Sequence, residues 1–406
     1  MIWRDPRSRT VLGSILLSSV GVGVYVLALG QLLFTITGTP LAFAVVVTAQ
    51  GIGAIAVLPF AGPLVDGLRS QRVYAICSFS RAIVVLAIAL LGAGAIPHAV
   101  PLITVAALVL AMLDNVQRTA LFKFIAHHVS EENKVKVNGL SGAAIQVGVL
   151  GGMALLGLVL TVGTAAHALL LTAAGSAGAA LWMSTVKLDK AEGPGALSSV
   201  PLRAALPAAV RDWRQMLRQY RGELVVFGML VLCAADFVAA HSLSTLVVPL
   251  VADHYGGQSW FIAALEATFG IGMLAASVVT RYTVTQRLLP VWVGVQAAMA
   301  LLLSASSQPV MHFLGYFVVG FANFNSLTWL ITTLQQHAGD ADKAKMASLR
   351  LLSIGLGTAS LMPLIGSASQ ISLDSAFVGL AAVLAAFTLC GLWVALGFRP
   401  KVPVTR

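Results

Sequence analysis

The chain has 406 residues, of which 58% are hydrophobic and only 10% are Asp, Glu, Lys or Arg. Soluble domains carry about 25% charged residues, because a folded soluble surface has to be hydrated. The composition therefore excludes a soluble multidomain protein and indicates an integral membrane protein. The 25 Lys and Arg residues exceed the 15 Asp and Glu residues, and their positions decide whether this excess serves nucleic-acid binding or membrane topology.

The hydrophobic stretches predict transmembrane helices, since about 20 apolar residues are needed to cross a hydrocarbon core of about 30 Å. The first stretch follows a basic N-terminus and is too long for the core of a signal peptide, so we expect it to be retained as the first helix. Twelve stretches are predicted to span the membrane: 10–36, 41–65, 72–91, 100–126, 138–160, 168–186, 223–251, 259–280, 288–303, 310–335, 347–365 and 375–398.

The spans form two sets of six, separated by a charged segment. We predict an all-α membrane protein made of two pseudo-symmetric six-helix bundles, 1–186 and 223–406, joined by a cytoplasmic linker, 187–222. Apolar residues recur in the linker at helical spacing, which predicts an amphipathic helix along the inner membrane face. A solvated tether helix is the alternative. The apolar residues are Leu206, Val210, Trp213, Met216, Leu217 and Tyr220.

The loop Lys and Arg residues predict the orientation, because cytoplasmic loops are enriched in them. With the N-terminus inside, the alternate loops on the outer side carry no Lys or Arg. We therefore expect both termini in the cytoplasm of a bacterial-type cell and a multi-pass protein of its inner membrane. The net charge of +10 then reflects the membrane topology, and the same cations attract anionic lipids weakly. No nucleic-acid partner is expected. The basic segments on the inner side are 4–9, 69–72, 134–136, 187–221, 281–287, 343–345 and 399–406.

Two inner loops repeat one pattern. The segment EENKVKVNGL at 131–140 matches DADKAKMASL at 340–349, at an offset of 209 residues. At the same offset Arg72 falls on Arg281. A parallel repeat of two halves is one of the arrangements built for alternating access. Transport is therefore the leading function that the sequence predicts.

A loop rich in glycine and arginine joins the second and third predicted spans. Its sequence, GPLVDGLRSQRV, has a Gly, three further residues, an Asp and then a basic cluster. It resembles the loop signature of the major facilitator superfamily, although Gly67 stands where that family usually has a basic residue. The resemblance implies a conformational switch formed by Gly62, Asp66, Arg69 and Arg72, in which the Asp pairs with basic groups in one state and releases them in the other.

Further features are similar to the drug and siderophore exporter branch of that superfamily, which includes enterobactin and macrolide exporters. They are Arg81 in the third span, the tripeptide NGL that opens the fifth span, and the segments VPL and YGG after the seventh. Exporters of this type often carry Gly-x-x-x-Gly-Pro in the fifth span. Here Gly148 and Gly152 are present, but Met153 replaces the proline. The resemblance implies a proton-driven exporter, with Arg81, Gly148 and Gly152 in its switch.

One acid lies near the middle of the fourth span, where an ionisable group costs at least about 2.5–3.5 kcal/mol and is a functional-site candidate. This acid is Asp114, with Arg118 one turn away on the same face and Asn115 beside it. Two interpretations remain open: the cluster binds substrate or a proton, or Asp114 and Arg118 neutralise each other and only line the inner vestibule.

Two further acids lie in spans of the second half. Asp236 has no basic residue three or four positions away in the seventh span, and Glu266 lies in the eighth span at a depth similar to that of His241. We predict that Asp236 first, Glu266 second and Asp114 third carry the coupled proton. The alternative for each is a hydrogen-bonded structural carboxylate. Arg81 either acts in the switch or extends its long stem to the inner face.

Uncharged polar and aromatic residues near the midplane complete the predicted substrate site. A cavity with aromatic walls and a few amides suits an amphipathic organic solute, and the same residues also suit hydrogen bonds between packed helices. Together with Arg118, Asn115 and His241, the candidates are Tyr25, Gln50, Gln146, Asn323, Asn325 and Trp329.

The predicted function is proton-coupled export of an amphipathic small molecule, such as a drug, siderophore or metabolite. The sequence has no P-loop for ATP hydrolysis, its three cysteines lie far apart and its histidines do not cluster. We therefore expect no enzyme activity, metal site or cofactor. The expected partners are the substrate, protons and membrane lipids, with the chain acting as a monomer. The alternatives are an uptake symporter for a small nutrient and a transport-silent receptor.

Overall fold

The computed structural model describes most of the chain, and the statements below concern the residues that it describes. These residues are 6–66, 68–94, 99–129, 131–186, 207–208, 210–211, 214–215, 218, 220, 222–258, 260–337 and 343–397. Most of the predicted linker therefore lies outside the described residues, including Leu206, Trp213, Met216 and Leu217 of its amphipathic pattern.

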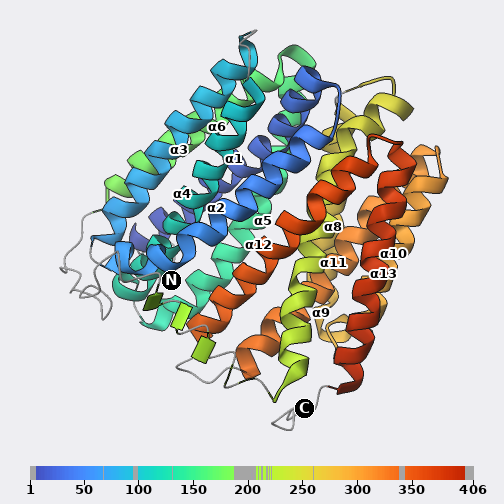
Figure 1. Cartoon of the computed structure of the whole chain (residues 1–406). Helices are drawn as coiled ribbons and strands as arrows, with labels where there is room; N and C mark the ends of the chain where they lie inside the picture. Colours follow the sequence, from blue (N-terminus) through green and yellow to red (C-terminus); the bar gives the residue numbers. More distant parts are fainter. Residues whose placement is uncertain are drawn as a thin grey trace. The chain divides into compact units, whose positions relative to one another are not determined.

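The described residues fold into twelve long α-helices and one 3-10 helix (Figure 1). The first six are α1 (Pro6–Thr37), α2 (Leu41–Asp66), α3 (Ser70–Ala93), α4 (Ala99–His128), α5 (Glu131–Val162) and α6 (Ala165–Ser184). The others are α8 (Leu224–His254), α9 (Trp260–Thr283), η2 (Gln286–Leu288), α10 (Leu289–Ala305), α11 (Pro309–His337), α12 (Lys343–Ala368) and α13 (Leu373–Gly397). This confirms the prediction of an all-α chain.

Eleven of these helices are long and apolar enough to cross a membrane. In α5 the apolar stretch found among the described residues, Val147–Val162, is shorter than a full span. The helix itself begins at Glu131, seven residues before the predicted start at 138, because helical hydrogen bonding continues through the charged loop. Twelve helices are thus observed, and the twelfth membrane crossing remains a prediction.

The helices begin and end where the sequence supplies suitable residues. Pro309 opens α11 and Pro290 lies in the first turn of α10, where the missing N–H of proline has no helical partner to lose. At the start of α6, Thr164 and His167 form a reciprocal capping box. After α8 the chain turns through Gly256 with φ of +59°, a conformation that glycine adopts without a Cβ clash.

The chain divides into two compact units. Unit 1 comprises Met1–Gly38, Ile52–Ala209 and Gln258–Ala264, and unit 2 comprises Thr39–Gly51, Val210–Gly257 and Leu265–Arg406. Helices α2 and α9 each contribute residues to both units. In unit 1, α1 packs against α5 and α6, while α3 packs against α4 and α6. In unit 2, α8 packs against α11, α12 and α13, while α10 packs against α11 and α13.

Glycines allow the close approach of α1 and α5 in unit 1. A Cβ atom on Gly152 would lie 2.1 Å from the carbonyl oxygen of Val20, and one on Gly148 would lie 2.6 Å from the Cβ of Ser19. Any side chain at Gly152 would therefore force the two helices apart. Gly148 and Gly152, which the resemblance assigns to the switch, thus lie where the backbones of α1 and α5 come into close contact.

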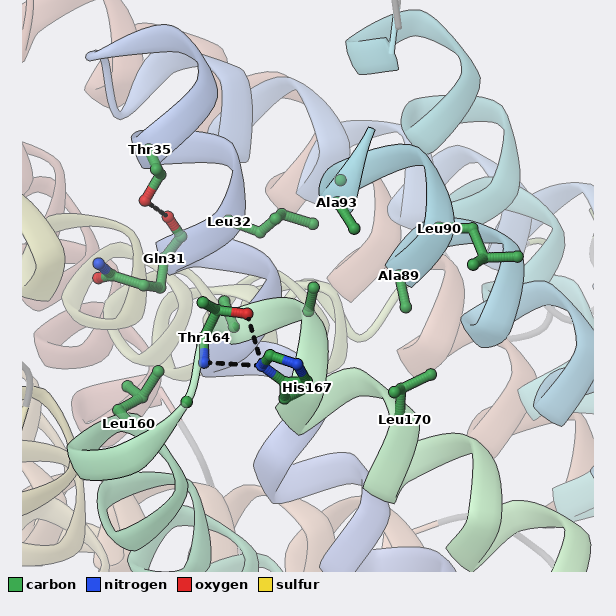
Figure 2. Close-up of a pocket in the computed structure, with 14 residues that line it drawn as sticks. Gln31, Leu32, Thr35, Ala89, Leu90, Ala93, Leu160, Thr164, His167 and Leu170 are labelled. Carbon is green, nitrogen blue, oxygen red and sulfur yellow. Dashed lines mark hydrogen bonds between the residues drawn. The ribbon is translucent and has the colours of Figure 1, made fainter. Parts of the chain in front are cut away.

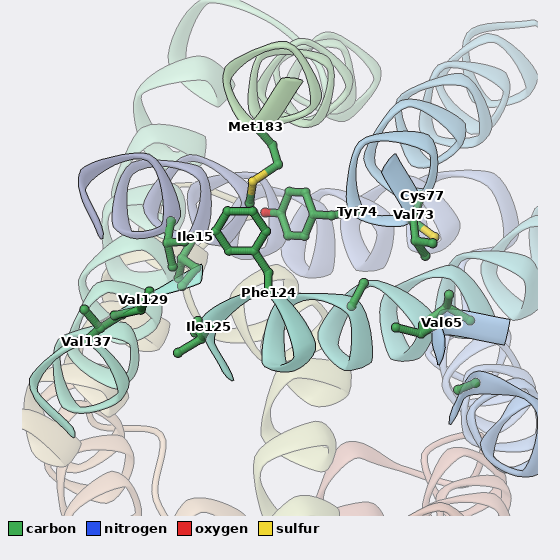
Figure 3. Close-up of a cluster of buried hydrophobic side chains, with 14 of the residues drawn as sticks. Ile15, Val65, Val73, Tyr74, Cys77, Phe124, Ile125, Val129, Val137 and Met183 are labelled. Atoms are coloured by element: carbon green, nitrogen blue, oxygen red, sulfur yellow. The ribbon is translucent and has the colours of Figure 1, made fainter. Parts of the chain in front are cut away.

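A cluster of buried apolar side chains fills one end of unit 1. Figure 3 shows Phe124 from α4, Tyr74 from α3 and Met183 from α6 turned toward one another. All three are at most 1% exposed. In membrane-spanning helices such side chains stabilise the fold by close packing rather than by leaving water. Tyr74 matters for the site below, because it also lines a cavity.

Candidate functional site

A cavity of about 130 Å³ lies inside unit 1, among α1, α3, α4 and α5. Its polar lining includes Tyr74 and Arg81 from α3, and Asp114, Gln117 and Arg118 from α4. Most of the remaining lining residues are apolar. This cavity contains the charged cluster that the sequence places near the middle of the fourth span.

Arg81 and Asp114 form a close ion pair across α3 and α4. The Nη1 atom of Arg81 donates to Oδ1 of Asp114 at 2.6 Å, and the side chains are 6% and 30% exposed. The alternative that Arg81 extends to the membrane face is therefore wrong, because its guanidinium is buried against the carboxylate. Sequence spacing alone could not find this pair, since 33 positions separate the two residues.

Arg118 lies on the other side of Asp114 and is only loosely paired. Its Nη2 atom is 3.7 Å from Oδ2 of Asp114, and its side chain is 68% exposed. The predicted neighbour one turn away is thus confirmed, but Arg81 is the tighter partner of the acid. Asn115 donates its side-chain amide to the carbonyl of Ala111 in its own helix at 2.9 Å.

A larger cavity of about 630 Å³ lies at the ends of α1, α3, α5 and α6. It is lined by Gln31, Thr35 and His167 together with apolar residues, and no Asp, Glu, Lys or Arg lines it. Figure 2 shows that Nδ1 of His167 accepts a hydrogen bond from the backbone N–H of Thr164 and also contacts the Thr164 hydroxyl at 3.0 Å, and these contacts cap α6. We regard the smaller, charged cavity as the better candidate, since it holds groups that can recognise a substrate.

The second candidate region is a buried polar cluster around Asp236 in unit 2. Gln296 from α10 and Ser326 from α11 both donate to Oδ1 of Asp236, at 3.0 and 2.6 Å. Asn323 donates to the backbone carbonyl of Asp236 at 2.7 Å. Asp236 is 1% exposed, and its Oδ2 has no hydrogen-bond partner among the described residues. The structure therefore brings Asp236 and Asn323, two of the predicted residues, into one network.

Glu266 and His241 lie apart from this network. Glu266 on α9 is 3% exposed, its hydrogen-bond partner is the hydroxyl of Ser244, and its Oε1 has no partner in the described part of the chain. The ring of His241 lies next to that of Phe237, with centroids 6.4 Å apart. His241 and Glu266, which the sequence places at a similar depth, thus have separate neighbours, Phe237 and Ser244.

The remaining predicted substrate residues are scattered over several helices. Asn325 donates to the carbonyl of Phe321 in its own helix and accepts from Thr283, and Trp329 is 7% exposed within an apolar cluster beside Leu330. Tyr25 is 7% exposed on α1, and Gln50 lies half-buried on α2. The side chain of Gln146 lies outside the described residues.

The loop between α2 and α3 is tied down by residues whose role the sequence did not reveal. The Nζ atom of Lys123 on α4 donates to the carbonyls of Val65 and Leu68, both at 3.0 Å. Gln71 donates to the carbonyls of Met183 and Val186, at 2.8 and 2.7 Å, and so caps the end of α6. Among the predicted switch residues, Arg69 and Arg72 are exposed, and the side chain of Asp66 and the surroundings of Gly62 lie outside the description.

Gln296 and Ser326 are further site residues that sequence reasoning missed. Gln296 is 0% exposed, and its amide is a strongly polar group within the 17-residue apolar helix α10. A lone amide in such a stretch is a detectable signal, because a buried polar group costs stability unless it is hydrogen-bonded. Ser326 gives no comparable signal, because serine is common in transmembrane helices, where it bonds its own backbone.

Solved structures match this chain in fold. The solved structure of nucleoside transporter NupG has a TM-score of 0.72 and 15% identity, covering 97% of this chain and 100% of that one. A D-xylose-proton symporter has a TM-score of 0.72 and 14% identity, covering 98% of each chain. A bacterial homolog of the human lysosomal transporter Spinster, in an inward-facing and unoccupied conformation, has a TM-score of 0.71 and 13% identity, covering 97% and 96%.

At these identities the solved structures show the fold alone, and no curated protein matches the sequence significantly. Family membership comes from the sequence itself. The model of the Major Facilitator Superfamily matches residues 11–357, which is most of the chain. The chain therefore belongs to the Major Facilitator Superfamily of membrane transporters.

Proposed function

We propose that this protein is a secondary active transporter that exports an amphipathic small molecule in exchange for protons by alternating access. The family and the all-helical membrane fold support transport. In each unit the first helix packs against the fifth and sixth, and the third helix packs against the fourth and sixth. The first and third helices are α1 and α3 in unit 1, and α8 and α10 in unit 2. This shared packing order supports two repeated halves. The export direction rests on the resemblance to drug and siderophore exporters.

The observation that carries the proton coupling is the environment of Asp236. This acid is 1% exposed, one of its oxygens has no hydrogen-bond partner, and no Lys or Arg of the described chain pairs with it. An isolated buried carboxylate without a cation costs several kcal/mol. We infer that Asp236 takes up a proton in one part of the cycle and loses it when its surroundings open. Glu266, also buried with one unpartnered oxygen, is the second proton carrier, and Asp114 the third.

Gradient-driven transport by purified protein in proteoliposomes tests this proposal. The substrate is first found by a thermal-shift screen at two pH values. With that substrate, Asp236→Asn should abolish accumulation driven by an imposed pH gradient while leaving the exchange of labelled for unlabelled substrate intact. The matched control is Asp374→Asn, since Asp374 is an exposed acid in the first turn of α13. Gradient-driven accumulation that persists with Asp236, Glu266 and Asp114 all neutralised would contradict the coupling scheme.

Uptake by proton symport is the second candidate function. One solved structure of similar fold is described as a D-xylose-proton symporter, and another as bearing on proton dependent oligopeptide transporters. Cells that produce the protein should be depleted of substrate if it exports and should accumulate substrate if it imports. Binding without any flux in either direction would indicate the third candidate, a transport-silent receptor.

A further inference from the structure

The charged cavity of unit 1 has an uncompensated positive charge. Among the residues that line it, Arg81 and Arg118 are cationic and Asp114 is the only acid. The carboxylate of Asp114 is held by Arg81 at 2.6 Å, whereas Arg118 is 3.7 Å away. Since an N–H···O hydrogen bond requires about 2.7–3.2 Å, the planar donor group of Arg118 is left largely unused by the protein.

Gln117 adds a second recognition group to the same wall. Gln117 is 6% exposed, lines the cavity, and its Oε1 has no hydrogen-bond partner in the described part of the chain. Its amide also lies within hydrogen-bonding reach of the Tyr74 hydroxyl. The oxygen and nitrogen of a glutamine amide exchange places by rotation. Because Oε1 is itself buried, a carboxylate can use this amide only after it turns so that its oxygen accepts from the Tyr74 hydroxyl and an N–H points into the cavity.

The size of the cavity indicates which part of a ligand fits. A volume of about 130 Å³ is well below the roughly 300–1,000 Å³ of pockets that enclose drug-sized molecules. Apolar side chains, including Ile15, Val22 and Val149, form most of the remaining wall, together with two serines, Ser18 and Ser19. This space suits a charged head group and the first carbons attached to it, and not the whole of an amphipathic molecule.

We propose that this cavity is the head-group subsite of the transporter and that the transported class is organic monoanions, in particular amphipathic carboxylates. Arg118 forms a two-pronged contact with the carboxylate, and the Gln117 amide contributes one further hydrogen bond. Arg81 stays paired with Asp114 and sets the position of that acid. This inference rests on the proposed transport function, but it concerns binding alone and makes no use of Asp236 or of protons.

The test is ligand binding to the full chain in detergent, measured by calorimetry with probes that share one phenyl ring. Phenylacetate is the anionic probe, phenylacetamide the neutral one and phenethylammonium the cationic one. We expect phenylacetate to bind most tightly. Arg118→Gln should weaken it by about 10-fold to 100-fold, as for the loss of a charged hydrogen bond, and Gln117→Met by about 2-fold to 10-fold. Arg118→Lys should retain part of the affinity, because it keeps the charge and loses the planar fork.

Arg287→Gln is the matched control, since it removes the same charge at an exposed position outside the cavity and should leave binding unchanged. An unchanged unfolding temperature without ligand shows that each variant is folded. Tighter binding of phenethylammonium, no binding of phenylacetate at millimolar concentration, or equal effects of Arg118→Gln and Arg287→Gln would each overturn the proposal. None of these outcomes supports or contradicts proton coupling, which the Asp236→Asn experiment tests separately.

Discussion

The guanidinium of Arg81 on α3 and the carboxylate of Asp114 on α4 are joined by a hydrogen bond of 2.6 Å. Arg81 is almost fully buried, so Asp114 is the group that makes its burial possible. The two cations around Asp114 therefore differ in their burial and in how closely they pair with this acid. Arg81 is buried and tightly paired with Asp114, whereas Arg118 is exposed and only loosely paired with it.

This division predicts unequal stability effects. Asp114→Asn leaves the buried Arg81 without its anion and should cost about 3 kcal/mol, at the lower end for a broken buried pair because Asp114 is itself 30% exposed. Arg118→Gln breaks only an exposed contact of 3.7 Å and should cost less than about 1 kcal/mol. Denaturant unfolding in detergent measures both. The double variant Arg81→Met with Asp114→Asn should be more stable than Asp114→Asn alone, and equal losses for Asp114→Asn and Arg118→Gln would contradict the assignment.

The contact between α1 and α5 predicts that substitutions at two neighbouring glycines, Gly151 and Gly152, have very different effects on stability. A Cβ on Gly152 would lie 2.1 Å from the Val20 carbonyl oxygen, while one on Gly151 meets nothing within 4 Å. Gly152→Ala should therefore lower the free energy of unfolding by about 1–3 kcal/mol through overpacking. Gly151→Ala should be neutral or slightly stabilising, because alanine is the better helix former. Thermal unfolding of the two variants measures this difference in stability. A similar loss of stability in both variants would rule out the close helix contact as its cause.

Lys123 should hold the loop between α2 and α3 in place. Lys123→Met keeps most of the side-chain length but removes the donor to the Val65 and Leu68 carbonyls, at a cost of about 1.5–3 kcal/mol for hydrogen bonds to a charged group. Amide hydrogen exchange in segment 65–72 should become faster than in the unaltered protein. Lys123→Arg keeps a donor and should show an intermediate rate. Unchanged exchange in Lys123→Met would show that other contacts position this loop.

The contact at the C-terminal end of α8 predicts a pH effect. The ring of His312 carries a hydrogen on Nε2, since it contacts the Ser306 carbonyl at 2.6 Å, so its Nδ1 accepts from the Tyr255 hydroxyl at 2.7 Å. Burial raises the pKa of the Tyr255 hydroxyl above its usual value. The protonated Tyr255 hydroxyl therefore contributes fully to the free energy of unfolding below the unfolded-state pKa of about 10. This contribution is lost as the pH rises through the folded-state pKa.

Tyr255→Phe measures this contribution. It should lower the free energy of unfolding by about 1 kcal/mol at neutral pH, the usual value for one hydrogen bond. The difference between Tyr255→Phe and the unaltered protein should shrink above a pH of about 10, where the tyrosine loses its proton more readily in the unfolded chain. Unfolding curves recorded across this pH range give the result. A difference that stays constant through high pH would show that the hydroxyl titrates equally in both states.

The sequence predicted the helices well because the membrane imposes a simple rule on them. Every backbone group in hydrocarbon has to be bonded within its own helix, so length and hydropathy suffice to locate spans. The largest error in a helix start, at α5, occurred where the helix continues into a charged loop and this rule no longer applies. The candidate acids Asp114, Asp236 and Glu266 were found by the same logic, since a charged group in an apolar helix stands out.

The partners of those acids are a different matter, because they come from other helices. Arg81 reaches Asp114 from α3, and Gln296 and Ser326 reach Asp236 from α10 and α11, 60 and 90 positions along the chain. Spacing within one helix specifies which residues share a face but says nothing of the face that packs against it. The sequence alone thus determined the membrane-spanning helices and their rare charges. Only the tertiary structure decided which charges are closely paired and which remains exposed, because ion pairs depend on distances of a few ångströms between helices remote in sequence.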